Sequence, residues 1–226
     1  YTAREFGLQM KDSGAEAIVV LANFANIVEK CLDQTTLKHV VVTEIGDMIP
    51  GIKGKIINFV VKYVKKMVPK WNIASAVALS DALSSGANHQ LNDVKIDSND
   101  VAFLQYTGGT TGLPKGAEVT HRNLIANIQQ VQSASGGLVE EGIESFVTAL
   151  PLYHIFALTV SWYGILRGAR LHLIANPRDI PGFIKDLKAH KDTVFVGLNT
   201  LFNALLNNSN FENVDFSGYK FTISGG

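Results

Sequence analysis

The chain has 226 residues, of which 46% are hydrophobic and 18% are charged, and its formal net charge is zero. This composition is typical of a globular protein with a sizeable core, and the balanced charge argues against a bulk attraction to nucleic acid. The single cysteine, Cys31, excludes an internal disulfide and is interpreted as a core thiol in a reducing, cytoplasmic environment. No Cys/His cluster has the spacing of a zinc site, so no metal-ligand residues are predicted.

The first part of the chain alternates between helix and strand patterns. Thr2 followed by Glu5 is typical of a capping box at the start of a helix. The expected elements are a helix over 2–13, a buried strand over 17–21, a helix over 24–32 and a strand over 39–43. Strands that alternate with helices indicate an α/β fold with mixed, largely parallel sheets and flanking helices.

A basic segment at about 50–69 interrupts this alternation. No acidic residue stands between Asp47 and Asp81, and the segment 50–69 carries five lysines, namely Lys53, Lys55, Lys62, Lys65 and Lys66. At about 100° per residue, one helix face would carry Lys55, Asn58, Lys62, Lys65 and Lys66, and the other Ile52, Ile56, Phe59, Val60, Tyr63, Val64 and Met67. A basic amphipathic helix suits an anionic membrane surface, and the alternative is a surface helix docked on its own core with solvated lysines.

The remainder of the chain returns to short apolar runs separated by polar ones. The expected elements are a polar loop over 84–100, strands over 101–105 and 117–120, a helix over 122–133, a loop over 135–144, a strand over 147–150, a buried helix over 157–166, a strand over 170–175, a helix over 180–190, a strand over 193–197, a helix over 200–206 and a strand over 220–224. Leu124, Ile125, Ile128 and Val131 are expected to point inward. The uncharged stretch 146–166 could span a bilayer by length, but Pro151 and its polar residues favour a strand and a buried helix.

The stretch YTGGTTGLPKG over 106–116 predicts a phosphate-binding loop. Its glycines allow close approach of the backbone to a ligand, and successive backbone N–H groups form a concave anion site. Thr107, Thr110 and Thr111 add hydroxyl donors, and Lys115 adds a point charge in an otherwise neutral stretch. A triphosphate is the natural ligand for this set.

This loop is not a Walker loop, which needs Gly-Lys-Ser/Thr running into a helix. Leu113 and Pro114 separate Gly112 from Lys115, and the residues that follow are typical of a strand. The order strand, phosphate loop, strand is therefore a different design. The alternative is a flexible Gly/Thr hairpin turn, which is the commoner meaning of a glycine-rich stretch.

Followed by THRNL, this loop resembles the phosphate loop of the adenylate-forming enzymes, which include acyl-CoA synthetases, luciferases and the adenylation domains of peptide synthetases. PLYHIFAL at 151–158, NTLFNALL at 199–206 and SGG at 224–226 resemble later segments of this family in the same order. Together they look most like a bacterial long-chain fatty-acid–CoA ligase. The implied fold is part of the large amino-terminal domain of such an enzyme, and both chain ends look cut rather than natural.

The resemblance implies roles for particular residues. The nucleotide phosphates would be bound by Tyr106, Thr107, Gly108, Gly109, Thr110, Thr111, Gly112, Leu113, Pro114, Lys115 and Gly116. The residues expected to act in catalysis are Lys115, Thr110 and His154. His154, Gly225 and Gly226 are expected at the acyl-substrate site, although a histidine among apolar residues is more often structural and a terminal Gly-Gly is also a plain turn.

The implied reaction is the two-step, ATP-dependent conversion of a long-chain fatty acid into acyl-adenylate and then acyl-CoA, with Mg²⁺ sharing the phosphate charge and coenzyme A as co-substrate. In the family, the metal-holding glutamate, the ribose-binding aspartate and a catalytic lysine lie later than 226, so this stretch alone is expected to be inactive. The expected organisation is a first α/β subdomain piece over 1–100, with the insertion at 50–69 and the loop at 84–100, and a truncated phosphate-loop subdomain over 101–226.

Two alternatives stay open. An amino-acid or other carboxylate adenylation enzyme resembles this loop, but it usually carries an Asp shortly after the Pro-Leu-x-His motif, and residues 155–160 contain no acid. A non-catalytic nucleotide- or lipid-binding module is the second alternative. A cytoplasmic location is expected, with the basic segment favouring peripheral contact with the inner face of the cell membrane, and the sequence does not indicate an oligomeric state.

Overall fold

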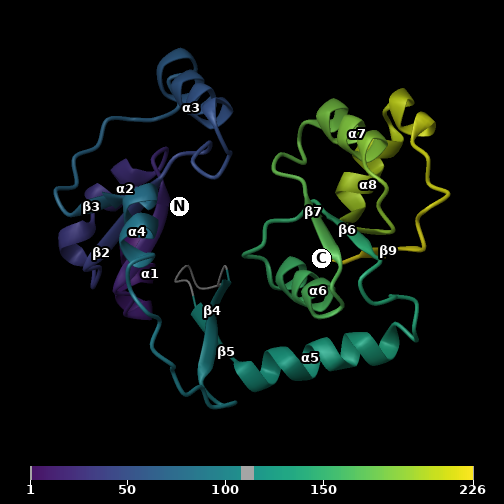
Figure 1. Ribbon diagram of the computed structural model, residues 1–226, viewed down its shortest axis with the longest axis horizontal. Coiled ribbons are helices and arrows are strands. Elements are labelled where there is room, and N and C mark those ends of the chain that lie inside the picture. The colour runs from purple at the N-terminus through teal and green to yellow at the C-terminus, as the bar shows by residue number, and fades with distance from the viewer. Residues whose placement is uncertain (1, 108–114, 226) are drawn as a thin grey trace. The chain divides into compact units, whose positions relative to one another are not determined.

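The computed structural model describes residues 2–107 and 115–225, which divide into two compact units (Figure 1). The first unit comprises residues 1–95 and 106–116, and the second comprises residues 96–105 and 117–226. In both units parallel strands alternate with helices, so the predicted α/β class is confirmed.

The first unit is built on a three-stranded parallel sheet with the order β1-β2-β3. Its elements are α1 (Ala3–Ser13), β1 (Ala17–Leu21), α2 (Ala25–Glu29), a 3-10 turn η1 (Leu32–Gln34), β2 (His39–Thr43), α3 (Ile52–Phe59), a π-helical turn η2 (Val60–Val64), β3 (Ala76–Ala78) and α4 (Leu79–Gly86). In the core of this unit, Val28, Val40 and Ile73 pack against Ile18 and Val20 of β1. The prediction of a buried strand over 17–21 is only half right, because Val19 on the other side of β1 is 65% exposed.

Local signals explain where α1 begins and ends. Thr2 caps the helix, since its hydroxyl accepts the Glu5 N–H and the Glu5 carboxylate accepts the Thr2 N–H at 2.7 Å. Gly14 ends it with φ of 63°, a conformation that glycine adopts without strain. The next helix, α2, ends at Glu29 and is shorter than predicted. After it the Cys31 N–H bonds to the Val28 carbonyl, three residues back, and Cys31 is buried against Gly7 of α1.

The second unit is built on a four-stranded parallel sheet with the order β7-β6-β8-β9. Its elements are β4 (Val101–Thr107) and β5 (Lys115–Thr120), which form a two-stranded sheet shared with the first unit, followed by α5 (His121–Ala134), β6 (Ser145–Thr148), α6 (Ile155–Leu166), β7 (Arg170–Leu173), α7 (Ile180–Ala189), β8 (Val194–Gly197), α8 (Asn199–Leu206), a 3-10 turn η3 (Ser209–Asn213) and β9 (Phe221–Ser224).

Helices cover both faces of this sheet, which is why its central strands β6 and β8 are wholly buried. Phe146 and Val194 point to one face and pack with α5 and α6. Val147 and Phe195 point to the other face and pack with α7 and α8. Ile125, which was expected to point inward from α5, is 55% exposed, so that part of the prediction is wrong.

The uncharged stretch 146–166 is divided between β6 and α6, as the sequence predicts. Throughout residues 2–107 and 115–225, no helix has the length and apolar character needed to cross a membrane. The twelve residues of α6 are instead partly buried in the core, with Ala157 and Tyr163 almost fully covered.

Candidate functional site

The strand order in the sheet of the second unit reverses at one point. The chain passes from β6 to β7 on one side and then returns to β8 on the other side of β6, so the strand order reverses between β6 and β8. In open α/β sheets, ligands bind beyond the carboxyl ends of the strands at such a reversal. His154 follows β6, Asn199 follows β8 and Gly225 follows β9, which places all three after the carboxyl ends of neighbouring strands.

His154 is the N-cap residue of α6. Its Nδ1 accepts the N–H of Phe156 at 3.3 Å, and its own N–H closes a turn to the Pro151 carbonyl at 2.9 Å. Because a backbone N–H can only donate, this hydrogen bond assigns the tautomer in which Nδ1 accepts and the ring N–H is at Nε2. The exposed imidazole therefore presents an N–H donor, and the helix cap fixes the direction of the ring.

Gln105 holds the backbone of this histidine turn. Its Nε2 donates to the Tyr153 carbonyl at 2.8 Å, across 48 residues of sequence. Gln105 is also the residue directly before Tyr106, where the predicted phosphate loop begins. Sequence reasoning missed this residue, because nothing in the local pattern indicates a long-range side-chain contact.

We expect Gln105→Ala to lower the rate of adenylate formation in the full-length protein by roughly tenfold, because a small displacement of a positioned group is costly. The melting temperature should change little, because the bond is a single one at an exposed carbonyl. Gln105→Glu, which keeps the size but cannot donate, should behave like Gln105→Ala. The exposed Gln132→Ala is the matched control, and an equal rate loss in that control would remove the positioning role.

Gly225 lies beside the start of α6. A Cβ atom at Gly225 would come within 3.2 Å of the Phe156 ring, so a side chain here would press on the helix that His154 caps. Next to it, the Ser224 hydroxyl donates to the Asn199 Oδ1 at 2.7 Å and ties the end of β9 to the start of α8. Gly226, the other predicted glycine, lies outside the described residues.

The described residues of the predicted phosphate loop, at 106–107 and 115–116, belong to the first unit. The rest of β4 and β5 belongs to the second unit. The Tyr106 hydroxyl donates to Asp12 at 2.6 Å, and burial together with this carboxylate raises the pKa of Tyr106 to about 12. Its ring leaves no room for a side chain at Gly116, because an added Cβ would lie 3.0 Å from the ring. Tyr106 therefore anchors the strand as a neutral phenol.

Lys115 is the first residue of β5, and its side chain is exposed. No carboxylate among residues 2–107 and 115–225 lies within 4.0 Å of its amine. Thr107 ends β4. The predicted loop residues Gly108, Gly109, Thr110, Thr111, Gly112, Leu113 and Pro114 lie outside the described residues, so their roles stay predictions.

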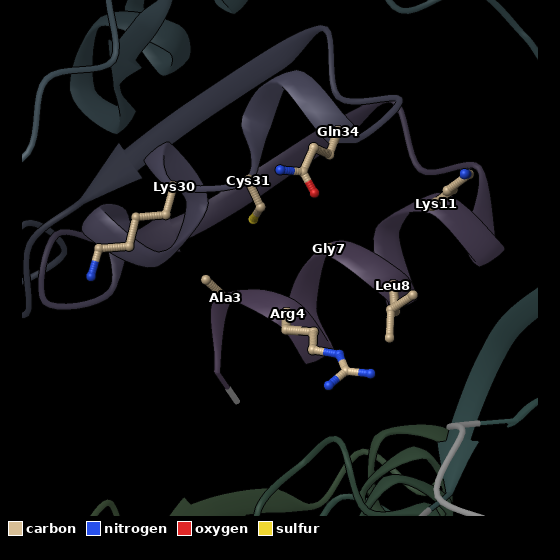
Figure 2. A pocket seen from close by; sticks show the side chains of 8 residues that line it. All are labelled: Ala3, Arg4, Gly7, Leu8, Lys11, Lys30, Cys31 and Gln34. Carbon is tan, nitrogen blue, oxygen red and sulfur yellow. The ribbon is translucent and has the colours of Figure 1, made fainter.

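A pocket of about 590 Å³ lies elsewhere in the first unit, between α1 and the segment formed by α2 and η1 (Figure 2). None of the predicted site residues lines it. Its three basic side chains, Arg4, Lys11 and Lys30, point in different directions, so they do not converge on one anion (Figure 2). Burial raises the pKa of the Cys31 thiol, which argues against a reactive cysteine and confirms its prediction as a core thiol.

Comparison with known proteins gives the family. The family of AMP-binding enzymes matches the chain over residues 1–226. The chain is 49% identical over 227 residues to a long-chain-fatty-acid–CoA ligase of Escherichia coli O6:H1, and 49% identical over 229 residues to the protein of that name from Haemophilus influenzae. These matches cover 100% of this chain but only 40% and 41% of the two relatives, so the chain spans less than half of their length.

Solved structures share the fold. The N-terminal domain of FACL13 from Mycobacterium tuberculosis has a TM-score of 0.70 at 16% identity, covering 100% of this chain and 48% of that one. The anthranilate CoA ligase AuaEII in complex with anthranoyl-AMP has a TM-score of 0.72 at 18% identity, covering 99% and 38%. These similarities confirm the fold expected from the sequence resemblance. Because the family match extends over the whole chain, this chain belongs to the family of AMP-binding enzymes.

Proposed function

We propose that the protein containing this chain activates a long-chain fatty acid with ATP and passes the acyl group to coenzyme A. The observation that carries the proposal is the pairing of a phosphate-loop sequence with a capped histidine at the strand-order reversal of a parallel sheet. The two relatives at 49% identity bear the name of long-chain-fatty-acid–CoA ligases, which supports the acyl class. The absence of any acid in residues 155–160 supports an apolar tail over an amino acid.

In this proposal the fatty carboxylate attacks the α-phosphorus of ATP, and the bond to the β-phosphate oxygen breaks to release pyrophosphate. The coenzyme A thiol then attacks the acyl carbon, and AMP leaves. Lys115 and the amides and hydroxyls of residues 107–111 neutralise the charge that gathers on the departing pyrophosphate. His154, as an Nε2–H donor, binds an oxygen of the carboxylate or of the adenylate, and Gly225 borders the acyl chain.

Magnesium enters this proposal with the nucleotide. The part of the chain that the structure describes contains no cluster of three or more His, Cys, Asp or Glu residues that could hold a metal ion. In this proposal Mg²⁺ would be brought by the phosphate oxygens of ATP. We also propose that the protein works in the cytoplasm and contacts the inner face of the cell membrane, where long-chain fatty acids dissolve.

The proposal is tested by pyrophosphate release from the full-length protein with ATP and Mg²⁺. Oleate should give release that needs ATP and should yield oleoyl-CoA when coenzyme A is added, whereas amino acids should give background rates. Release with an amino acid instead of oleate would favour the amino-acid adenylation alternative. Nucleotide or lipid binding without any pyrophosphate would favour a non-catalytic binding module.

A further inference from the structure

An unpaired apolar stripe runs along the helix that α3 and η2 form together. Ile52, Ile56, Phe59 and Tyr63 recur at spacings of four, three and four residues, which return to the same side of a helix. Their exposed fractions are 75%, 54%, 58% and 59%, and the Phe59 and Tyr63 rings contact each other with centroids 5.1 Å apart. We call these four residues the α3 stripe.

The opposite side of the same helix is fixed to its own unit. Gly54 is buried against Gly46, and a Cβ atom at either glycine would overlap the carbonyl oxygen of the other. The Asn58 side chain accepts the Gly46 N–H at 2.7 Å and donates to Asp47 at 2.8 Å. Asn58, which the sequence predicts on the same face as Lys55 and Lys62, is the polar anchor of the docked side.

This attachment favours the membrane-surface meaning of the amphipathic pattern over the docked-helix alternative. A helix docked on its own core would bury its apolar face. Here Gly54 and Asn58 contact the rest of the unit, and the apolar face is exposed. Figure 1 shows α3 at one end of the first unit, away from α1. The α3 stripe is therefore displayed on a rigid support, and a binding partner could cover it without rearrangement of the helix.

The charges around the α3 stripe point to the kind of partner. Residues 48–80 contain six lysines and no acid, and Lys55 and Lys62 lie along one flank of the stripe. The nearest acids are Glu44, which lies 3.6 Å from Lys62 on that flank, and Asp47, which bonds Asn58 on the docked side. The outward surface is therefore apolar at its centre and positive at its border.

We infer that the α3 stripe and its lysines bind the surface of an anionic lipid bilayer. Apolar and aromatic side chains of such a helix enter the boundary between headgroups and acyl chains, while lysines at its border meet the negative headgroups. Lysine is depleted in protein–protein interfaces, so a lysine border favours lipid over a protein partner. The inference rests on the proposed function, because membrane binding would bring the enzyme to the lipid bilayer in which its fatty-acid substrate dissolves.

The test is sedimentation of the full-length protein, without ATP, with vesicles of phosphatidylglycerol and phosphatidylcholine. Phe59→Gln combined with Tyr63→Gln should lower the partition coefficient about tenfold or more. Replacement of Lys55, Lys62, Lys65 and Lys66 by Gln should lower it at least about tenfold at low salt and less at high salt. The wild type should bind poorly to pure phosphatidylcholine.

Two matched controls belong to this experiment. The first control, Leu91→Gln with Val94→Gln, changes two exposed apolar residues in a loop of the same unit. The second control removes the same amount of positive charge elsewhere, by changing to Gln the lysines Lys95, Lys185, Lys188 and Lys191. Both controls should bind vesicles like the wild type. Pyrophosphate release with dispersed oleate is measured in parallel, so that a loss of vesicle binding and a loss of catalysis are separate results.

Three outcomes would overturn the inference. The first is unchanged vesicle binding in both α3 variants, and the second is equal binding of the wild type to neutral and anionic vesicles. The third is a large fall in melting temperature for Phe59→Gln with Tyr63→Gln, which would show that the α3 stripe packs against another part of the full-length protein. Loss of binding with an unchanged melting temperature, confined to the α3 variants, supports it.

Discussion

Replacement of Lys115 by Ala should lower adenylate formation from fatty acid and ATP by roughly a hundredfold, or about 3 kcal/mol, by analogy with the loss of one donor from an oxyanion hole. Lys115 is exposed at the start of β5, directly after the predicted phosphate loop. Its cation would act where negative charge gathers on the leaving pyrophosphate. Thr110→Ala removes a neutral donor from the same loop and should cost less, about 1 kcal/mol.

The two half-reactions distinguish this role from a structural one. Thioester formation from preformed acyl-adenylate and coenzyme A involves no pyrophosphate, so Lys115→Ala should affect it far less than adenylate formation. Lys185→Ala, which changes an exposed lysine of α7, is the control and should leave both steps unchanged. Equal losses in both steps, or a fall in melting temperature that accounts for them, would mean that Lys115 supports the fold.

The second large effect is expected at the amino ends of the strands, opposite the candidate site. The Glu144 side chain is fully buried there and accepts hydrogen bonds from Lys220 at 2.7 Å, from the Glu140 N–H at 3.0 Å and from the Thr193 hydroxyl. Lys220 precedes β9 and Thr193 precedes β8, so one carboxylate joins three segments of the second unit. Glu144→Ala would leave partly buried donors without their acceptor.

We expect Glu144→Ala to destabilise the full-length protein by about 2 kcal/mol, because partly buried donors lose a charged acceptor while Lys220 keeps Glu140 as a partner. The measurement is thermal unfolding. Glu212→Gln, at an exposed carboxylate of η3, is the control. A melting temperature for Glu144→Ala equal to that of the wild type would show that the cluster contributes little.

The same carboxylate predicts the direction of a pH effect. Burial by itself raises the pKa of Glu144, but the hydrogen bonds from Lys220, Thr193 and the Glu140 backbone outweigh it and hold the pKa below the ordinary 4.5. A lowered pKa means that the charged form favours the folded state, so this stabilisation is present above pH 4.5 and is lost as pH falls through the folded pKa. The difference in melting temperature between wild type and Glu144→Gln should therefore shrink below pH 4.5.

Sequence patterns predicted the elements whose signals are local. Thr2 with Glu5 marks the start of α1, and the Thr120 hydroxyl likewise accepts the Asn123 N–H at the start of α5. The strands β1 and β2 have the predicted bounds because each is an apolar run between turns. By contrast, β3 was missed, since a three-residue strand has no period of its own and forms by pairing with β2.

The parts of the site and of the fold that could not be predicted depend on contacts distant in sequence. The position of His154 after a strand and before a helix was inferred from its neighbours, and α6 begins directly after it. The bond from Gln105 to the Tyr153 carbonyl and the pairing of Glu144 with Lys220 join residues 48 and 76 positions apart. Neither has a local signature, because the fold alone brings the partners together.

The measurement that tests the central proposal most directly follows an oxygen atom. Oleate labelled with oxygen-18 in its carboxylate is converted to oleoyl-CoA by the full-length protein with ATP, Mg²⁺ and coenzyme A. The masses of AMP, pyrophosphate and oleoyl-CoA are then measured by mass spectrometry. Attack of the carboxylate on the α-phosphorus leaves one labelled oxygen in AMP and none in pyrophosphate. Label in phosphate or pyrophosphate, or unlabelled AMP beside labelled oleoyl-CoA, would contradict the adenylation of a fatty acid by this protein.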